Sequence, residues 1–336
     1  MENTAPTKLT HRRWIVSAKY DFVFFIGSAG ASLLLYLFHL LLVSTFNLRL
    51  EERTGLISFV LFIGLFDMPH ILQTFSRTHA DRQEYERHRN RITWGLVAAL
   101  IIGEVLLAAE LEDYLFMVGA LYGIWHILRQ NVGFVKIYKA LHKDFARIDN
   151  LLDSGIFYAT VLACVTELEE LIGAAVVVAV LFVVRQIQLA VKTGSVNLPK
   201  LLFIGVQIPL YWYLFFGLDV PILLFVAIET IYHDIQYYGW IRFYQKQRFR
   251  EDPGFANRWL IRTVAASLII SGVTYSAFVS SGATYFSELN RDVLTYFFVP
   301  LYMLVLYHYY IEGFIWRFRE SPELKEVLYS SVEPVT

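Results

Sequence analysis

The sequence is poor in charge, in cysteine and in the short motifs of common soluble enzymes. Charged residues make up 18% of the 336 residues, whereas soluble domains contain about a quarter. The single cysteine, Cys164, lies in an apolar run, so disulfide bonds play no part. GxSxG, Walker, GxGxxG and CxxC motifs are all absent, which leaves no signal for a serine hydrolase, a nucleotide-binding loop or a dithiol site.

Two further absences narrow the possible membrane chemistry. No lysine lies deep in a late apolar run, which argues against a retinal Schiff base. The clustered HxxHH boxes of membrane fatty-acid desaturases are also missing. The net charge of −1 says little about partners, and we expect no nucleic acid among them.

Long apolar runs are abundant instead. Hydrophobic residues make up 56% of the chain, and its mean hydropathy is +0.48. Aromatic residues reach 16%, which is typical of membrane helices with Trp and Tyr at the interfaces. Runs such as "DFVFFIGSAGASLLLYLFHLLLV" approach or exceed the roughly 20 residues that a membrane-spanning helix needs. We therefore predict an all-α, polytopic transmembrane helical bundle.

Ten spans can be drawn along the chain. They lie at residues 22–43, 56–75, 92–109, 114–138, 151–166, 171–191, 201–217, 221–243, 260–280 and 293–316. We expect residues 1–20 to be a cytoplasmic N-terminal segment, residues 21–318 to form a single transmembrane domain, and residues 319–336 to be a cytoplasmic tail.

The charges of the connections alternate along the chain. One set is basic, as in "KIYKALHKDFAR" and "KTGSVNLPK", and the other is acidic or uncharged, as in "ELED", "ELEE" and "GLD". Because Lys and Arg favour the cytoplasmic side, ten spans with both termini in the cytoplasm satisfy these charges, and only "NLRLEER" is mixed. We expect an integral protein of a cell or inner membrane, in contact with membrane lipids.

Four of the nine histidines share one depth in this predicted bundle. His70, His126, His233 and His308 lie in the second, fourth, eighth and tenth spans, which all run from outside to inside. A basic residue follows them after seven, ten, nine and nine residues, at the cytoplasmic end of each span. With about 1.5 Å of rise per residue, all four lie roughly 10–15 Å above the inner boundary. Chance would scatter them.

Each of these histidines also has a polar neighbour on its own helix face. The neighbours lie three or four residues away: Asp67 before His70, Gln130 after His126 with Asn131 beside it, Glu229 before His233, and Glu312 after His308. A carboxylate near the bilayer centre costs about 2.5–3.5 kcal/mol, and a divalent metal would compensate for this. Imidazole suits iron, zinc or copper, and ligating histidines usually donate their other N–H to a carboxylate or amide. Interhelical hydrogen bonds, worth about 0.6 kcal/mol each, are the alternative explanation.

Further residues extend the candidate site. Pro69 would kink its helix and free a carbonyl, as membrane proteins tolerate where backbone lines a cavity. The residues expected to contact the ligating histidines or the substrate are Arg129, Gln130, Asn131, Asp234, Gln236, Tyr237 and Tyr309. An aromatic slot for a polyene or acyl chain could include Tyr237, Tyr238, Tyr309 and Tyr310, although interfacial anchoring is an equal explanation for Tyr238 and Tyr310. Arg129 and Arg185 would pair with a carboxylate, bind a lipid headgroup or snorkel to the interface, and for Arg185 we expect snorkelling.

The histidine segments read "GLFDMPH", "IWHILRQN", "IYHDIQY" and "HYYIEGFIWR". In order and character they resemble those of the Brp/Blh family of membrane-bound β-carotene dioxygenases. The last is the most similar, through the spacing from His308 to Arg317 and the "FIWR" ending, with the acid Glu312 about one position earlier. The family's third segment carries a second histidine where this chain has Tyr237, and Glu229 is the candidate substitute. The resemblance covers four short segments and implies that the four histidines ligate iron, with β-carotene as a possible substrate.

Together these features predict a membrane-embedded non-haem iron oxygenase that acts on a hydrophobic substrate, a carotenoid or another lipid, with O2. The iron would be held by the four histidines. Glu312, Glu229 and Asp67 would orient imidazoles or handle protons, or would ligate directly if two metals are present. The alternatives are a b-type haem electron-transfer protein, a transporter with a buried His/Glu site, and a purely structural protein.

Overall fold

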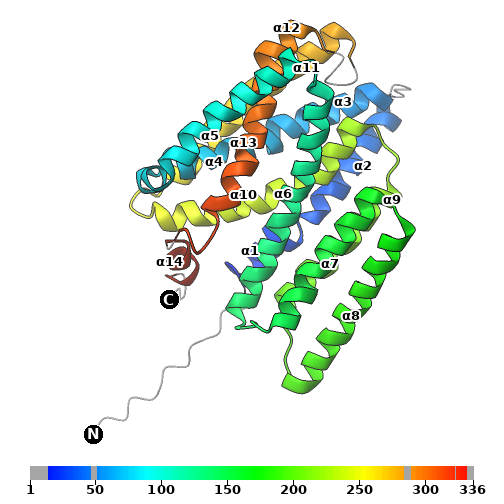
Figure 1. Ribbon diagram of the computed structural model, residues 1–336, viewed down its shortest axis with the longest axis vertical. Coiled ribbons are helices and arrows are strands. Elements are labelled where there is room, and N and C mark those ends of the chain that lie inside the picture. Colours follow the sequence, from blue (N-terminus) through cyan, green and yellow to red (C-terminus); the bar gives the residue numbers. More distant parts are fainter. Residues whose placement is uncertain (1–13, 47–50, 284–288, 322, 331–336) are drawn as a thin grey trace.

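The regular elements are all helices in the part of the chain that the structure describes, residues 14–46, 51–283, 289–321 and 323–330 of a computed structural model (Figure 1). Labels α mark α-helices and labels η mark π-helices. The units in chain order are α1–η1–α2 (Ala18–Asp21, Phe22–Ile26, Ala29–Phe46), α3–η2–α4 (Glu51–Phe62, Ile63–Asp67, Met68–Thr78), α5 (Arg82–Ala108), α6 (Glu112–Leu141), α7 (Arg147–Thr166), α8 (Glu169–Thr193), α9 (Leu198–Gly217), α10 (Ile222–Arg248), α11 (Phe255–Ser281), α12–η4–α13 (Arg291–Val293, Leu294–Phe298, Val299–Ile315) and α14 (Glu323–Ser330).

Each apolar segment predicted from the sequence lies inside one of these helical units or extends past its end by a single residue, although several units are longer than the predicted segment. Among the described residues, seven helices are long and apolar enough to cross a membrane. The count rises to eight if α1–η1 and α2, which are bent by 50°, form one span. Helices α6 and α10 are not among them, because polar residues such as His126 and His233 lower their mean hydropathy.

The outer helices leave their apolar side chains exposed. The most apolar window of α8 is only 11% buried and that of α5 only 17%, and α8 lies at the edge of the bundle (Figure 1). Val176, Val177 and Val180 on α8 are each more than half exposed. Apolar surface this extensive is unusual for a soluble monomer, whereas helices with such surfaces suit lipid. These long apolar helices indicate a membrane protein.

Helix α10 is the central element of the bundle. It packs against α2, α3, α4, α6, α9, α11 and the π-helical segments η1 and η2, and it crosses the middle of the molecule in Figure 1. Its buried residues alternate between apolar ones, such as Leu224 and Ile231, and polar ones, such as His233 and Gln236. Because the polar residues face other helices, their interactions must be satisfied inside the protein.

The π-helical segments η2 and η4 each end two residues before a proline. Asp67 ends η2 and Pro69 follows in α4, while Phe298 ends η4 and Pro300 follows in α13. Proline has no N–H to donate to the carbonyl four residues earlier, and here the backbone takes a wider turn. Such π-turns are frequent at functional sites. The irregularity expected at Pro69 is therefore a π-turn placed just before His70.

A buried ion-pair network joins α6, α7 and α9 at one end of the bundle. Lys139 Nζ lies 2.5 Å and Lys200 Nζ 3.0 Å from Asp153 Oδ2. Both lysines also reach Asp144, at 2.8 and 3.3 Å. Lys139, Lys200 and Asp153 are at most 2% exposed, so each charge depends on the others for stabilisation.

A second polar contact joins the start of α5 to the end of α10. Asp81 accepts hydrogen bonds from the backbone N–H groups of Gln83 and Glu84, which caps α5. Arg248 approaches both of its oxygens, at 2.7 and 3.0 Å. Burial raises the pKa of Asp81, but the hydrogen bond and the charge of Arg248 lower it by a larger amount. The pKa of Asp81 therefore lies below its ordinary value of 3.8.

Candidate metal centre

Four helices bring their histidines to one place inside the bundle. His70 is the third residue of α4, directly after the π-turn, His126 lies in the middle of α6, His233 in the middle of α10 and His308 in α13. One ring nitrogen from each lies within 4.8 Å of those of the other three. All four side chains are buried, with exposures between 1% and 7%. The structure thus brings together the four histidines that share one predicted depth.

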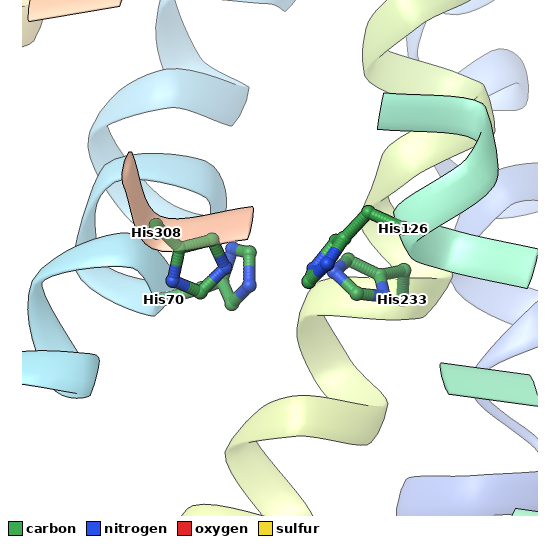
Figure 2. Close-up of side chains that lie close together, drawn as sticks. All are labelled: His70, His126, His233 and His308. Atoms are coloured by element: carbon green, nitrogen blue, oxygen red, sulfur yellow. The ribbon is translucent and has the colours of Figure 1, made fainter. Parts of the chain in front are cut away.

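The rings form a closed circle of neighbours. The ring centroid of His70 lies 4.4 Å from that of His308 and 4.9 Å from that of His233. The ring centroid of His126 lies 4.9 Å from that of His233 and 5.2 Å from that of His308. Figure 2 shows His70 with His308 on one side and His126 with His233 on the other, facing across a shared gap. Neighbouring rings are steeply inclined to each other, with angles of 66–88° between their planes.

Several of these nitrogen atoms have no hydrogen-bond partner among the described residues. They are Nδ1 and Nε2 of His70, Nε2 of His126, Nδ1 and Nε2 of His233, and Nε2 of His308. Buried polar groups almost always have a partner, because leaving one without a partner is costly. A divalent cation would supply one partner to all four rings at once.

The spacing of the donor atoms fits a single ion. Imidazole nitrogens bind such metals at about 2.0–2.1 Å, so two ligands of one ion are at most about 4.2 Å apart. The four donors lie within 4.8 Å of one another, so the widest pair would close by up to about 0.6 Å to take opposite positions, or by up to about 1.4 Å to reach the roughly 3.4 Å separation of a tetrahedral site. Iron, zinc and copper all accept this donor set. The role of the four histidines as ligands stays a prediction.

Thr74 orients His308 and was not found from the sequence. Its Oγ1 lies 2.7 Å from His308 Nδ1 and 3.0 Å from the Tyr237 hydroxyl, and it donates to Glu312 Oε1 at 3.3 Å. Because Nδ1 of His308 is engaged, Nε2 is the atom that faces the other histidines. The available signal was position, since Thr74 follows His70 by one helical turn on the same face of α4.

The acidic residues divide between two sides of the cluster. Asp234 Oδ1 lies 2.9 Å from His70 Nδ1, without the angle of a hydrogen bond, and Asp67 joins these two in a second group whose donor atoms lie within 4.8 Å. Glu312 lies between two other histidines, with Oε2 3.7 Å from His126 Nε2 and Oε1 3.8 Å from His308 Nδ1. Asp67 and Glu312 therefore lie beside the histidines, as their spacing in the sequence predicts.

Two candidate residues lie away from the histidine nitrogens. Glu229 belongs to neither group of potential ligands, and its Oε2 accepts a hydrogen bond from Thr230. Asn131 donates to the hydroxyl groups of Tyr211 and Tyr232, at 3.1 and 3.3 Å, and so joins α6 to α9 and α10. Their spacing from the histidines along the helix did not predict these contacts, because packing between helices sets which neighbour each side chain meets.

The two glutamines support His233 through its backbone. Gln130 donates to the carbonyl of His233 and to Gln236 Oε1, both at 3.1 Å. Gln236 in turn donates to the carbonyl of Phe25 at the end of η1, at 3.2 Å. This chain of amides holds α6, α10 and η1 together around the cluster.

An aromatic cavity of about 720 Å³ opens beside the histidines. His126, Glu312, Tyr237 and Tyr309 line its inner end, and the ring of Tyr309 stacks on that of His126 with centroids 4.4 Å apart. Tyr310 also lines it. The predicted slot is therefore present with three of its four tyrosines, because the Tyr238 hydroxyl donates to the carbonyl of Phe66 instead.

The two arginines singled out in the sequence have separate surroundings. Arg129 lines the cavity and donates to the Tyr158 hydroxyl at 3.2 Å. Arg185 pairs with Asp149, with Nε 2.6 Å from Oδ1, and so takes the carboxylate partner rather than the snorkelling position. Only Arg129 belongs to the candidate site.

Comparisons with protein-family models, with curated proteins and with solved structures find no match to this chain.

Proposed function

We propose that this protein is a membrane-embedded non-haem iron oxygenase that acts on a hydrophobic substrate, a carotenoid or another lipid. The observation that carries the proposal is the meeting of four buried imidazoles, with open nitrogens, beside an aromatic cavity that one of them, His126, lines. A transition metal needs such donors, and a catalytic metal needs access for a second reactant. The likeness of the four histidine segments to those of the Brp/Blh carotenoid dioxygenases supports iron and O2.

Iron, when bound by the four imidazoles, supplies the position at which O2 is activated. The overall reaction of a dioxygenase of this class balances without a reductant. A carbon–carbon double bond of the substrate breaks, and each atom of one O2 molecule ends in one of two new carbonyl groups. The cavity, rather than a solvent-filled cleft, is where an apolar polyene or acyl chain would lie.

The chain's own residues would hold the ligands and the substrate in place. Thr74 keeps His308 Nδ1 engaged, and Asp234, whose Oδ1 lies 2.9 Å from Nδ1 of His70, would attract a proton to that nitrogen by its charge, so that Nε2 of each ring remains for ligation. Glu312 lines the cavity and is the acid placed to exchange a proton with a bound substrate or to complete the ligand set. Asp67 would orient His70, or ligate a second metal together with Asp234. We assign no direct contact with metal to Glu229.

Ten spans with both termini in the cytoplasm remain our proposed topology, in a cell or inner membrane. In support, ten helical units follow one another before the short α14 in the described chain. The connections at one end contain the basic sequences, including those between α4 and α5, α6 and α7, α8 and α9, and α10 and α11. Helices α6 and α10 would then be spans whose polar residues face the metal centre instead of lipid.

The test is the metal content and absorption spectrum of the detergent-purified protein beside two alanine variants. We expect stoichiometric iron without a haem Soret band in the wild type, loss of iron in His308→Ala, and retention in His39→Ala, another buried histidine in α2. His233→Gln serves as a second site variant should His308→Ala fail to fold. A metal-free wild type, a haem band, or equal iron in all variants would overturn the proposal.

A further inference from the structure

The cavity beside the histidines has two ends of different chemistry. Along α6 its lining residues include His126, Arg129, Gly133 and Lys136, a spacing that places them on one helix face. His126 and Lys136 are ten residues apart, which corresponds to about 15 Å along the helix axis. The cavity therefore extends from the metal centre toward the end of the bundle with the basic connections.

The charges that line the cavity are mostly positive. Its one lining carboxylate, Glu312, lies beside the histidines, Arg129 lies one helical turn from His126, and three further cations line the cavity: Arg91, Lys136 and Arg317. A cavity with cations at one end and aromatic rings such as Trp125, Trp240 and Trp316 along its walls suits a molecule that is acidic at one end and apolar along its length.

The cations are only partly neutralised by the protein. Arg91 and Arg317 share one carboxylate, that of Glu320, at 2.8 and 3.1 Å. Arg129 donates to the uncharged hydroxyl of Tyr158, and Lys136 makes no hydrogen bond or ion pair among the residues that the structure describes. Four positive charges facing one nearby carboxylate leave a net attraction for an anion at this end.

We infer that the cavity binds an amphiphile with an acidic headgroup, a carboxylate or a phosphate, on a long apolar chain. The headgroup would lie at Lys136, about 15 Å along α6 from His126, and the chain would run along the aromatic walls past Arg129 toward His126. This inference rests on the proposed function only where it treats the bound amphiphile as a substrate, since binding of the amphiphile needs no metal. It narrows the substrate class from any hydrophobic molecule to an acidic lipid.

Two glycines on opposite walls offer a way to close the cavity without disturbing the packing. Gly133 on α6 and Gly313 on α13 both line it, and a Cβ added at either meets no heavy atom within 4 Å. A leucine at these positions would project into the cavity, and it is also a better helix former than glycine. Gly205 on α9 has equally open space but does not line the cavity, so Gly205→Leu is the matched control.

The experiment measures binding of a radiolabelled long-chain unsaturated fatty acid to the holoprotein in nanodiscs of uncharged phospholipid. We expect saturable binding, about tenfold weaker binding of the corresponding fatty alcohol, and a roughly tenfold loss in Lys136→Gln, the factor that about 1.4 kcal/mol produces. Gly133→Leu and Gly313→Leu should abolish saturable binding, whereas Gly205→Leu should bind as the wild type does.

Two further measurements distinguish a membrane lipid from a free acid as the occupant, and distinguish failure of this inference from failure of the proposed function. Anionic phospholipid that displaces the fatty acid from the wild type would identify a membrane lipid as the natural occupant, and its failure to do so would favour a free acid. His308→Ala should lose iron yet keep the fatty acid bound, so loss of metal and loss of binding report on different proposals. Equal affinity for acid and alcohol, or binding that survives Gly133→Leu and Gly313→Leu, would overturn the inference.

Discussion

Replacing Thr74 by valine tests how the candidate metal centre is held. The substitution removes one hydroxyl and keeps the shape of the side chain. That hydroxyl is 2.7 Å from His308 Nδ1, 3.0 Å from the Tyr237 hydroxyl and within hydrogen-bond distance of Glu312. Valine would leave the Nδ1 side of His308 without its hydrogen bond, so the ring could rotate and change which nitrogen faces the other histidines.

The expected loss follows from these contacts. Removing the hydrogen-bond partner of a ligating histidine typically lowers metal affinity by roughly 10–100-fold, which is about 1.4–2.8 kcal/mol. Because one hydroxyl serves three groups here, we expect the upper half of that range, about 30–100-fold. The apoprotein should also lose roughly 1–3 kcal/mol of stability, since buried partners are left unsatisfied.

The assay is a titration of the metal-free protein with ferrous iron against a competing chelator, performed without oxygen. Thr78→Val is the matched control, because Thr78 lies one turn further along α4, is fully buried, and donates to the Thr74 carbonyl at 2.9 Å. We expect Thr78→Val to lose stability while its iron affinity remains near that of the wild type. Equal iron affinities for the two variants would refute the reasoning.

Three other changes have defined outcomes. Asp234→Asn should lower iron affinity about tenfold in the same titration, because an amide holds a proton on the neighbouring imidazole less strongly than a carboxylate does. Asp153→Asn removes one negative charge beside two buried lysines. The melting temperature in detergent should therefore fall by an amount equivalent to about 3 kcal/mol. An unchanged melting temperature would argue that Lys200 is solvated. Asp81→Asn should destabilise the protein at neutral pH. Because the pKa of Asp81 is lowered in the folded state, the stabilisation from its pair with Arg248 is complete above pH 3.8 and is lost as the pH falls through the folded-state pKa. The melting curves of variant and wild type should therefore converge at a pH below the folded-state pKa.

Apolar runs in the sequence located the helices, because backbone groups in a lipid environment must pair within their own segment, although α6 and α10 are less apolar than the candidate membrane helices. The ten predicted segments lie on the ten helical units that precede α14. The internal form of those units was less accessible. Pro69 predicted a kink, and the structure has a π-turn from Ile63 to Asp67 just before this proline. The turn at Leu294–Phe298 was not expected, although Pro300 follows it by two residues as Pro69 follows the first turn.

The parts of the candidate site that depend on the depth of a residue along its span could be predicted. The parts that depend on how each helix is rotated about its own axis could not. Similar distances of seven to ten residues from the basic ends of four spans placed His70, His126, His233 and His308 at one level, and their ring nitrogens lie within 4.8 Å of one another. Helical spacing alone assigned Glu229 to His233, yet Glu229 lies in neither group of potential ligands.

The sequence by itself determined that the chain forms apolar helices and that four imidazoles lie at the same height, since rise per residue and hydrophobic length are local properties. Only the tertiary structure decided which side chains meet across helices: Thr74 with His308, Asp234 with His70, and Asn131 with two tyrosines rather than with the cluster. Those pairings depend on the rotation and tilt of each helix against its neighbours, which close packing of side chains from distant parts of the chain sets.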